Sequence, residues 1–281
     1  MIYYYCSAET FQNIVKNKKL WLSDVTKSND SGEISLFIDV LKEKSKEAFS
    51  KLDHGVEDYN FNEIEYYNIF CSELRKALTG RKCLTMCFSS LADDLSQWRA
   101  YGDDGRGFCI GFADNEMRKI CNKYNLALHK VIYIRGHELD SNTQKRIKRM
   151  RNDIIHDIQN GKKRHDNIRG SIKGCIKEIV DTPPRIKDDA FSVEKETRIY
   201  LWDEIDKLEQ YTLGVHFNRN GFVPYIELDV SACNNLIKEI YIGPTNNGDA
   251  DVLQKFCDNY NLSADVKKSK IGYRCKVGGN N

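Results

Sequence analysis

The first residues of the chain follow a pattern of apolar and polar positions that predicts a strand, a helix and a second strand. Residues 2–7, IYYYCS, are mostly aromatic or apolar and predict a β-strand. Ser7 precedes a stretch in which Phe11, Ile14 and Val15 recur at helical spacing, so we expect a helix that Ser7 caps. The sequence KLWLSD predicts a second strand, and the turn-rich KSNDSGE after it indicates a loop.

Two further stretches have the periodicity of helices. The first covers residues 34–80 and ends at Gly80. The second covers about residues 140–182 and stops at Pro183 and Pro184. Apolar residues at helical spacing mark a packing face on the second stretch: Ile147, Met150, Ile154 and Ile158.

Strand patterns account for most of the remaining chain. The sequence CLTMCFSS places Leu84, Met86 and Phe88 on one face of a strand. A short helix is predicted in LADDLSQWRAYG, and strands are predicted in GRGFCIGF, HKVIYI, ETRIYLW, GFVPYIELDV and IKEIYIG. Strands therefore come from both ends of the chain and helices group in the middle. This order predicts an α+β fold, a single domain of residues 1–281 with helical insertions at about 34–80 and 140–182.

The composition narrows the class of protein. The chain has 281 residues, of which 41% are hydrophobic and 30% charged, and its net charge of +2 gives no global signal for a polyanionic partner. Its ten cysteines form no CxxC pair and no cluster with histidine at zinc-ligand spacing, so we expect packed thiols and no metal. The N-terminus does not resemble a signal peptide, and no apolar run reaches the length of a membrane span. We therefore expect a cytoplasmic protein without a membrane partner.

The second helical insertion carries a local excess of positive charge. From Lys145 to Lys173 there are ten lysines and arginines and three aspartates. Such an excess suits contact with the phosphates of a nucleic acid, and Arg146, Arg149 and Arg151 are the residues expected to make it. A solvated helical face explains the same charges.

Two glutamates stand two residues apart in FSVEKETRIYLW, which occupies residues 191–202. If both belong to one strand, the carboxylates of Glu194 and Glu196 lie side by side on one face, where like charges repel. Arg198 shares that face and could neutralise the pair. The alternative is a solvent-facing strand in which the glutamates pair with Lys195, Arg198 or other neighbours.

Several motifs resemble those of the bacterial family catalogued as domain of unknown function 2971. They are IYYYCSAETFQNIVKNKKLWLSDVTKSND, CLTMCFSS with LSQWRAYGDDGRGFCIGF, KDDAFSVEKETRI, IKEIYIGP and KSKIGYR. The motifs follow the family's order from Ile2 to Arg274, with Tyr4 and Cys6 where the family commonly has histidine and threonine. The wider layout looks like an ADP-ribosyltransferase fold of the kind seen in DNA-targeting DarT toxins. That resemblance implies a split core sheet of mixed or antiparallel strands.

The resemblance also implies a function. It suggests an enzyme that uses NAD as a substrate and transfers ADP-ribose to a macromolecular acceptor, either a nucleic acid or a protein. A bacterial toxin or phage-defence effector is the implied role, with a protein partner or antitoxin as a further expectation. Two alternatives stay open. One is an NAD glycohydrolase of the same fold, and the other is a non-catalytic module that binds a nucleic acid or another partner.

Cleavage of the N-glycosidic bond of NAD builds an oxocarbenium-like sugar cation that a carboxylate can stabilise. By the resemblance, Glu196 is expected to stabilise that cation and Glu194 to orient or deprotonate the acceptor. The residues expected to bind NAD are Tyr4, Tyr5, Ser7, Asn29, Asp30, Ser89, Ser90, Trp98, Arg99 and Tyr101. We expect the strands at residues 3–6, 85–89 and 196–201 to line one cleft.

Some of these residues also have a structural explanation. Trp98 and Tyr101 lie three apart on the predicted short helix, where core packing explains them better than a wall for nicotinamide or adenine. Asn29 and Asp30 suit a turn. Arg99 could meet the NAD pyrophosphate or form a surface ion pair.

Overall fold

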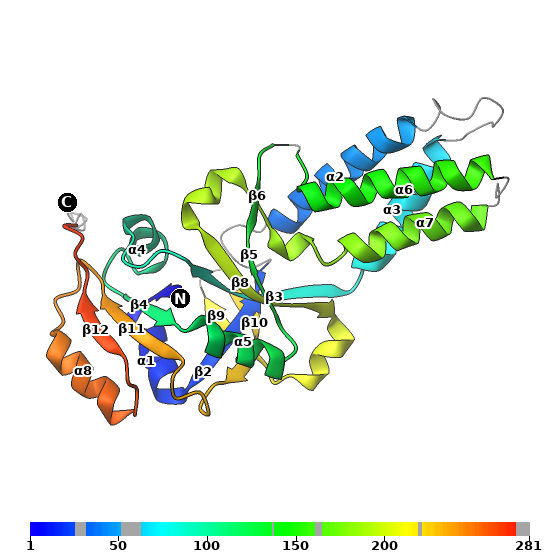
Figure 1. Ribbon diagram of the computed structural model, residues 1–281. Coiled ribbons are helices and arrows are strands. Elements are labelled where there is room, and N and C mark those ends of the chain that lie inside the picture. Colours follow the sequence, from blue (N-terminus) through cyan, green and yellow to red (C-terminus); the bar gives the residue numbers. More distant parts are fainter. Residues whose placement is uncertain (26–31, 52–62, 137, 161–164, 219–220, 274–281) are drawn as a thin grey trace.

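The computed structural model describes residues 1–25, 32–51, 63–136, 138–160, 165–218 and 221–273 (Figure 1). The strands are β1 Ile2–Cys6, β2 Lys19–Asp24, β3 Arg81–Ser89, β4 Phe108–Phe112, β5 Ala127–Lys130, β6 Ile132–Ile134, β7 Ile186–Asp188, β8 Glu196–Glu204, β9 Leu213–Asn218, β10 Gly221–Asp229, β11 Ile237–Ile242 and β12 Asp265–Lys268. The α-helices are α1 Ala8–Asn17, α2 Glu33–Ser50, α3 Glu63–Leu78, α4 Leu95–Tyr101, α5 Asp114–Lys123, α6 Ser141–Gln159, α7 His165–Ile179 and α8 Ala250–Asn259. Short 3₁₀ helices are η3 Pro183–Arg185, η4 Asp189–Glu194 and η5 Ile205–Gln210.

Local sequence signals explain where several helices begin. The Ser7 hydroxyl accepts a hydrogen bond from the Thr10 backbone amide at 3.2 Å, so it caps α1 as expected. Asp94 caps α4 in the same way, accepting from the amides of Ser96 and Gln97. These caps satisfy amide groups that the first turn of a helix leaves without a partner.

Strands from both ends of the chain form one large sheet. Its order is β12-β11-β4-β1-β3-β2-β10-β9, with β8 pairing with β3 and β5 pairing with β8. The β11–β12 pair is parallel, and the other pairs of this sheet are antiparallel. A separate parallel pair joins β6 to β7. The α+β class expected from the sequence is confirmed.

The sheet divides beside β3. On one side, β8 pairs with β3 along its whole length, from Arg81 to Ser89. On the other side, β1 pairs with β3 at Ser89, and β2 pairs with it at Thr85 and Leu84. The described ladder therefore leaves the residues between Thr85 and Ser89 without a strand partner on that side. β1 and β2 diverge from β3 there.

One face of the sheet is packed against helices. Leu84, Met86 and Phe88 of β3 lie in the main hydrophobic core, as their alternation predicts. α1, α5 and α8 contribute apolar side chains to the same core, so they cover this face. The alternate residues of β3, which include Thr85, Cys87 and Ser89, point to the opposite face.

The two helical insertions pack together, which the sequence did not indicate. α2 and α3 from the first insertion contact α6 and α7 from the second, and the four helices extend away from the sheet (Figure 1). Their shared core is separate from that of the sheet and includes Phe37, Phe70, Ile154 and Ile172. Ile134 of β6 and Ile186 of β7 belong to this second core, so the small sheet joins the bundle to the rest of the chain. The single-domain organisation stays a prediction.

Candidate active site

A cleft of about 450 Å³ lies where β1 and β2 diverge from β3. Most of its lining residues come from β1, α1, β2, β3, α4, β7, η4 and β8, and Ser7 and Val25 directly follow β1 and β2. The three strands expected to share a cleft therefore do so. The lining residues are Tyr3, Tyr4, Tyr5, Cys6, Ser7, Thr10, Trp21, Ser23, Val25, Thr85, Met86, Cys87, Phe88, Ser89, Gln97, Tyr101, Lys187, Phe191, Glu194, Glu196 and Arg198.

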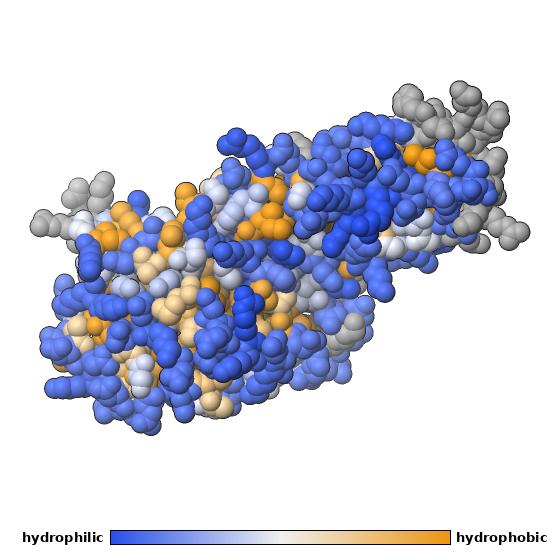
Figure 2. Space-filling model, viewed as in Figure 1, coloured by the Kyte–Doolittle hydropathy of each residue, from blue (hydrophilic) through white to orange (hydrophobic). Residues whose placement is uncertain are grey.

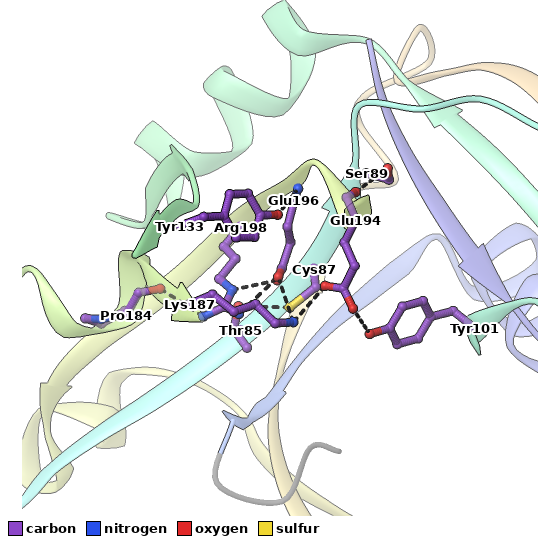
Figure 3. Close-up of polar contacts among 10 residues, drawn as sticks. All are labelled: Thr85, Cys87, Ser89, Tyr101, Tyr133, Pro184, Lys187, Glu194, Glu196 and Arg198. Atoms are coloured by element: carbon purple, nitrogen blue, oxygen red, sulfur yellow. Dashed lines mark hydrogen bonds and ion pairs between the residues drawn. The ribbon is translucent and has the colours of Figure 1, made fainter. Parts of the chain in front are cut away.

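Glu196 lies in a buried network of charges in this cleft (Figure 3). Arg198 Nε donates to Glu196 Oε1 at 2.6 Å, and Arg198 Nη2 donates to Oε2 at 3.1 Å. Lys187 Nζ also donates to Oε2, at 3.2 Å. The side chains of all three residues are at most 6% exposed. Glu196 is therefore held by two cations, one of them in a two-pronged contact.

Lys187 connects the two glutamates. Its ammonium donates to Glu194 Oε2 at 2.7 Å as well as to Glu196. The other oxygen of Glu194 accepts from the hydroxyl of Tyr101 at 2.8 Å. The two carboxylates therefore lie on either side of one ammonium, which offsets the repulsion expected between them.

The electrostatics of the network keep Glu196 charged. Burial by itself would raise the pKa of its carboxyl, but the hydrogen bonds and charge of Arg198 and the charge of Lys187 outweigh burial and lower it. Cys87, the cross-strand neighbour of Arg198, lies beside the same carboxylate. Cys87 is exposed in the cleft, and its enclosed setting there and the charge of Glu196 raise the pKa of its thiol.

Glu194 does not lie on the strand with Glu196, which corrects the sequence interpretation. It is the last residue of the 3₁₀ helix η4, and β8 begins at Glu196. Lys195 between them has a left-handed backbone, with φ of 47°. The alternation of strand side chains therefore does not apply to the pair, and the turn at Lys195 brings the carboxylates together instead.

Ser89 holds the start of β8 in place. It is paired with Glu196 in the β3–β8 ladder. Its hydroxyl donates to the Glu194 carbonyl oxygen at 2.7 Å and accepts from the Leu91 amide at 3.1 Å. Because both hydrogen bonds go to backbone groups, Ser89 supports the turn that carries Glu194.

The tyrosines expected at the site differ in their surroundings. Tyr4 and Tyr5 both line the cleft, but Tyr5 is 5% exposed. Its hydroxyl donates to the Leu91 carbonyl and accepts from the Asp94 amide, both at 2.9 Å. Tyr101 is 41% exposed and reaches the cleft from α4. Ser7 lines the cleft while it caps α1.

Three of the expected residues do not line the cleft. Trp98 is fully buried, and its indole donates to Asp93 at 2.9 Å. It packs edge-on against Tyr5, so core packing explains it. Ser90 and Arg99 are exposed outside the cleft. Asn29 and Asp30 lie outside the described residues.

Several lining residues were not assigned to the site from the sequence. Lys187 of β7 is the first residue of the KDDAFSVEKETRI motif, but it was not assigned to the site from the sequence. Arg198 was expected only as a neutralising charge. Trp21 of β2 has the alternation of a strand residue, which gives no sign that it lines a cleft.

The arginines expected to contact nucleic acid lie on α6. Arg146 and Arg149 both form ion pairs with Glu178 of α7. Arg151 is partly buried, and its Nε lacks a hydrogen-bond partner within the described residues. Figure 2 shows strongly hydrophilic side chains gathered over the helical bundle. Two of the three arginines therefore also serve packing between helices.

No helix among the described residues is long and apolar enough to cross a membrane. No group of three or more His, Cys, Asp or Glu side chains in that part of the chain could hold a metal ion.

Comparison with known proteins gives one match. The family model described as "Protein of unknown function (DUF2971)" matches residues 97–199. The matched stretch runs from α4 into β8 and includes Lys187, Glu194 and Glu196. No curated protein and no solved structure is significantly similar to the chain. Over residues 97–199, the chain is thus similar to a family of proteins of unknown function, in agreement with the resemblance seen in its motifs.

Proposed function

We propose that the cleft cleaves the N-glycosidic bond of NAD and transfers ADP-ribose to a macromolecular acceptor. The observation that carries the proposal is the pair of carboxylates joined by Lys187 in a cleft lined by four tyrosines. A volume of about 450 Å³ falls within the usual range for sites of small molecules. The resemblance to the ADP-ribosyltransferase layout supplies the choice of NAD.

The chemistry requires fixed negative charge beside the sugar. The bond between ribose C1′ and the pyridinium nitrogen breaks, and nicotinamide leaves as a neutral molecule with the bonding electrons. An acceptor oxygen or nitrogen then bonds to C1′, and its proton passes to a carboxylate or to water. A carboxylate held rigidly beside C1′ stabilises the cation without reorganising, which is the main way that such sites accelerate reactions.

The surroundings of the two glutamates favour different roles for them. Both oxygens of Glu196 are engaged by Arg198, and its side chain is 5% exposed. The side chain of Glu194 is 13% exposed and carries a hydrogen bond from Tyr101, which is itself exposed to the cleft. We therefore assign contact with the sugar to Glu194 and the fixing of Lys187 to Glu196. The sequence had instead predicted Glu196 at the sugar cation and Glu194 at the acceptor.

The experiment measures nicotinamide release from NAD labelled in its adenylate half, together with transfer of the label to components of a cell extract. Glu194→Gln should lower the rate of release by about 10²-fold or more, because a preorganised charge is lost. Its melting temperature should fall, because buried Lys187 loses its nearer carboxylate, so release is compared at a temperature at which both proteins are folded.

Glu73→Gln is the matched control. Glu73 of α3 is also held by an arginine and a lysine, but it lies in the helical bundle, away from the cleft. Its substitution should leave the rate unchanged. Release by Glu194→Gln at the wild-type rate, or no release by the wild type, would refute the proposal.

A non-catalytic binding module is the second candidate function. The observation in its favour is that Arg198 and Lys187 compensate both carboxylates, so the cluster carries no net charge. A stable network of this kind can hold a cleft open for a ligand without any reaction. Binding of NAD by the wild type without nicotinamide release would favour this function.

A further inference from the structure

Trp21 in the wall of the cleft belongs to a cluster of aromatic rings to which the proposed reaction assigns no role. Trp21 of β2 lines the cleft, and 40% of the residue is exposed. It lies on the strand that diverges from β3, on the side of the split away from β1. We call Trp21 and the two rings beside it, Tyr225 and His216, the aromatic shelf.

The three rings of the shelf come from three neighbouring strands. Trp21 lies 4.0 Å from Tyr225 of β10, measured between ring centroids, with an angle of 20° between the ring planes. His216 of β9 lies 6.0 Å from each of the other two rings. One face of the indole is thus covered by Tyr225, and the exposed part of Trp21 borders the cleft.

Further contacts hold the indole in one orientation. Its Nε1 donates to Glu227 Oε2 at 3.3 Å, and Lys19 forms an ion pair with the other oxygen of Glu227. The Tyr225 ring lies over Gly214, where an added Cβ would come within 2.5 Å of the ring. The absence of a side chain at Gly214 therefore leaves room for the ring that supports Trp21.

We propose that the aromatic shelf stacks against the nucleobase of a nucleotide bound in the cleft. The choice of a nucleotide rests on the proposed function. A flat, rigid aromatic surface suits stacking with a base, because every base has a π face and the indole loses little freedom on binding. The base could be the adenine of NAD or a base of a nucleic-acid acceptor. The competing explanation is a cross-strand aromatic contact that only stabilises the sheet.

Tryptophan fluorescence tests the shelf directly. The chain has three tryptophans, and neither Trp98 nor Trp202 lines the cleft. A base stacked on the shelf should therefore quench the fluorescence of Trp21 and leave that of the other two tryptophans unchanged. The probes are NAD, AMP, nicotinamide mononucleotide and a short single-stranded oligonucleotide. Trp21→Phe should abolish the quenching, and the control Trp202→Phe should retain it.

Affinity supplies the second readout. Trp21→Ala should weaken binding of the quenching probe by about 5-fold to 150-fold, the usual range for loss of one stacked base. Binding of nicotinamide mononucleotide, which lacks adenine, should not change. Quenching by NAD and AMP assigns the shelf to adenine, whereas quenching by the oligonucleotide alone assigns it to the acceptor.

The outcomes separate the shelf from the proposed reaction. If no probe quenches the fluorescence, or if Trp21→Ala binds the probe with unchanged affinity, base stacking on the shelf is refuted even if NAD is cleaved. If the wild type shows quenching but releases no nicotinamide, base stacking on the shelf is supported and only the proposed reaction is refuted. Glu194→Gln should keep the quenching, because its carboxylate does not belong to the shelf.

Discussion

Glu196→Gln should destabilise the protein, although two neighbouring glutamates in the sequence would suggest relief of repulsion. In the structure, the Glu196 carboxylate compensates Arg198 and Lys187, whose side chains are 3% and 6% exposed. Glutamine keeps the size of the side chain but removes its charge. Two buried cations would then share the single carboxylate of Glu194, which forms its ion pair with Lys187.

The magnitude follows from the burial of these cations. Removing one partner of a buried ion pair costs about 3–5 kcal/mol, because the remaining charge stays buried without compensation. For a chain of this size, a change of 1 kcal/mol moves the melting temperature by about 2 °C. We therefore expect Glu196→Gln to melt about 6–10 °C below the wild type.

Thermal melting followed by circular dichroism is the assay, and Glu73→Gln is again the control. Glu73 is bound by Arg169 and Lys76, but these cations are 45% and 60% exposed and can be hydrated when the charge is lost. Its substitution should cost about 1 kcal/mol or less, or about 2 °C.

A double substitution tests the cause of the destabilisation. Glu196→Gln with Arg198→Met removes the pair together and should melt above the value expected from the sum of the single variants. The reasoning is refuted if Glu196→Gln melts within about 1 °C of the wild type. The reasoning is also refuted if the loss of stability in the double variant equals the sum of the losses in the two single variants.

Three further predictions concern other parts of the chain. The stability contributed by Glu196 should depend on pH, because the pKa of its carboxyl in the folded protein lies below the ordinary value of 4.5. That stability is present above about pH 4.5 and is lost as the pH falls through the folded pKa. The melting difference between wild type and Glu196→Gln should therefore be constant near neutral pH and shrink below about pH 4.5; a constant difference down to pH 3 would contradict this. Gly107→Ala should strongly destabilise the protein, because its Cβ would lie 2.0 Å from the Cys6 carbonyl oxygen, whereas Gly174→Ala in α7 has open space and should be neutral or stabilising. Equal melting of the two alanine variants would show that the close approach at Gly107 relaxes freely. If α6 binds nucleic acid, Arg149→Glu should weaken that binding and reduce its dependence on salt concentration. The control Arg75→Glu on α3 should change neither property. Equal effects of the two variants would indicate non-specific electrostatic attraction.

Local features of the fold could be predicted because they depend on neighbours in the chain. The cap at Ser7, the buried face of α1 and the alternation of Leu84, Met86 and Phe88 all follow from residues a few positions apart. Their physical basis is the periodicity of helices and strands and the need to satisfy the first amides of a helix. The α+β class follows from the order of such segments.

The candidate site depended on contacts that these local rules do not describe. Glu194 and Glu196 are close because Lys195 adopts a left-handed backbone, which the alternation rule for strands excludes. Lys187 lies only seven and nine positions before them, and its ammonium meets both carboxylates because the short 3₁₀ helix η4 connects β7 to β8. The separation of β1 and β2 beside β3, which makes room for the cleft, is likewise a property of the whole sheet.

The sequence by itself determined the segments and the faces that they bury, because a few neighbouring residues are enough to decide backbone periodicity. Tertiary structure decided which segments share a core and which strands surround the cleft. Two helical insertions far apart in the chain share one core, and β1, β2, β3 and β8 come together at the cleft. Such contacts depend on how distant segments pack, and the free energy of that packing is shared across the entire core rather than encoded in any short stretch.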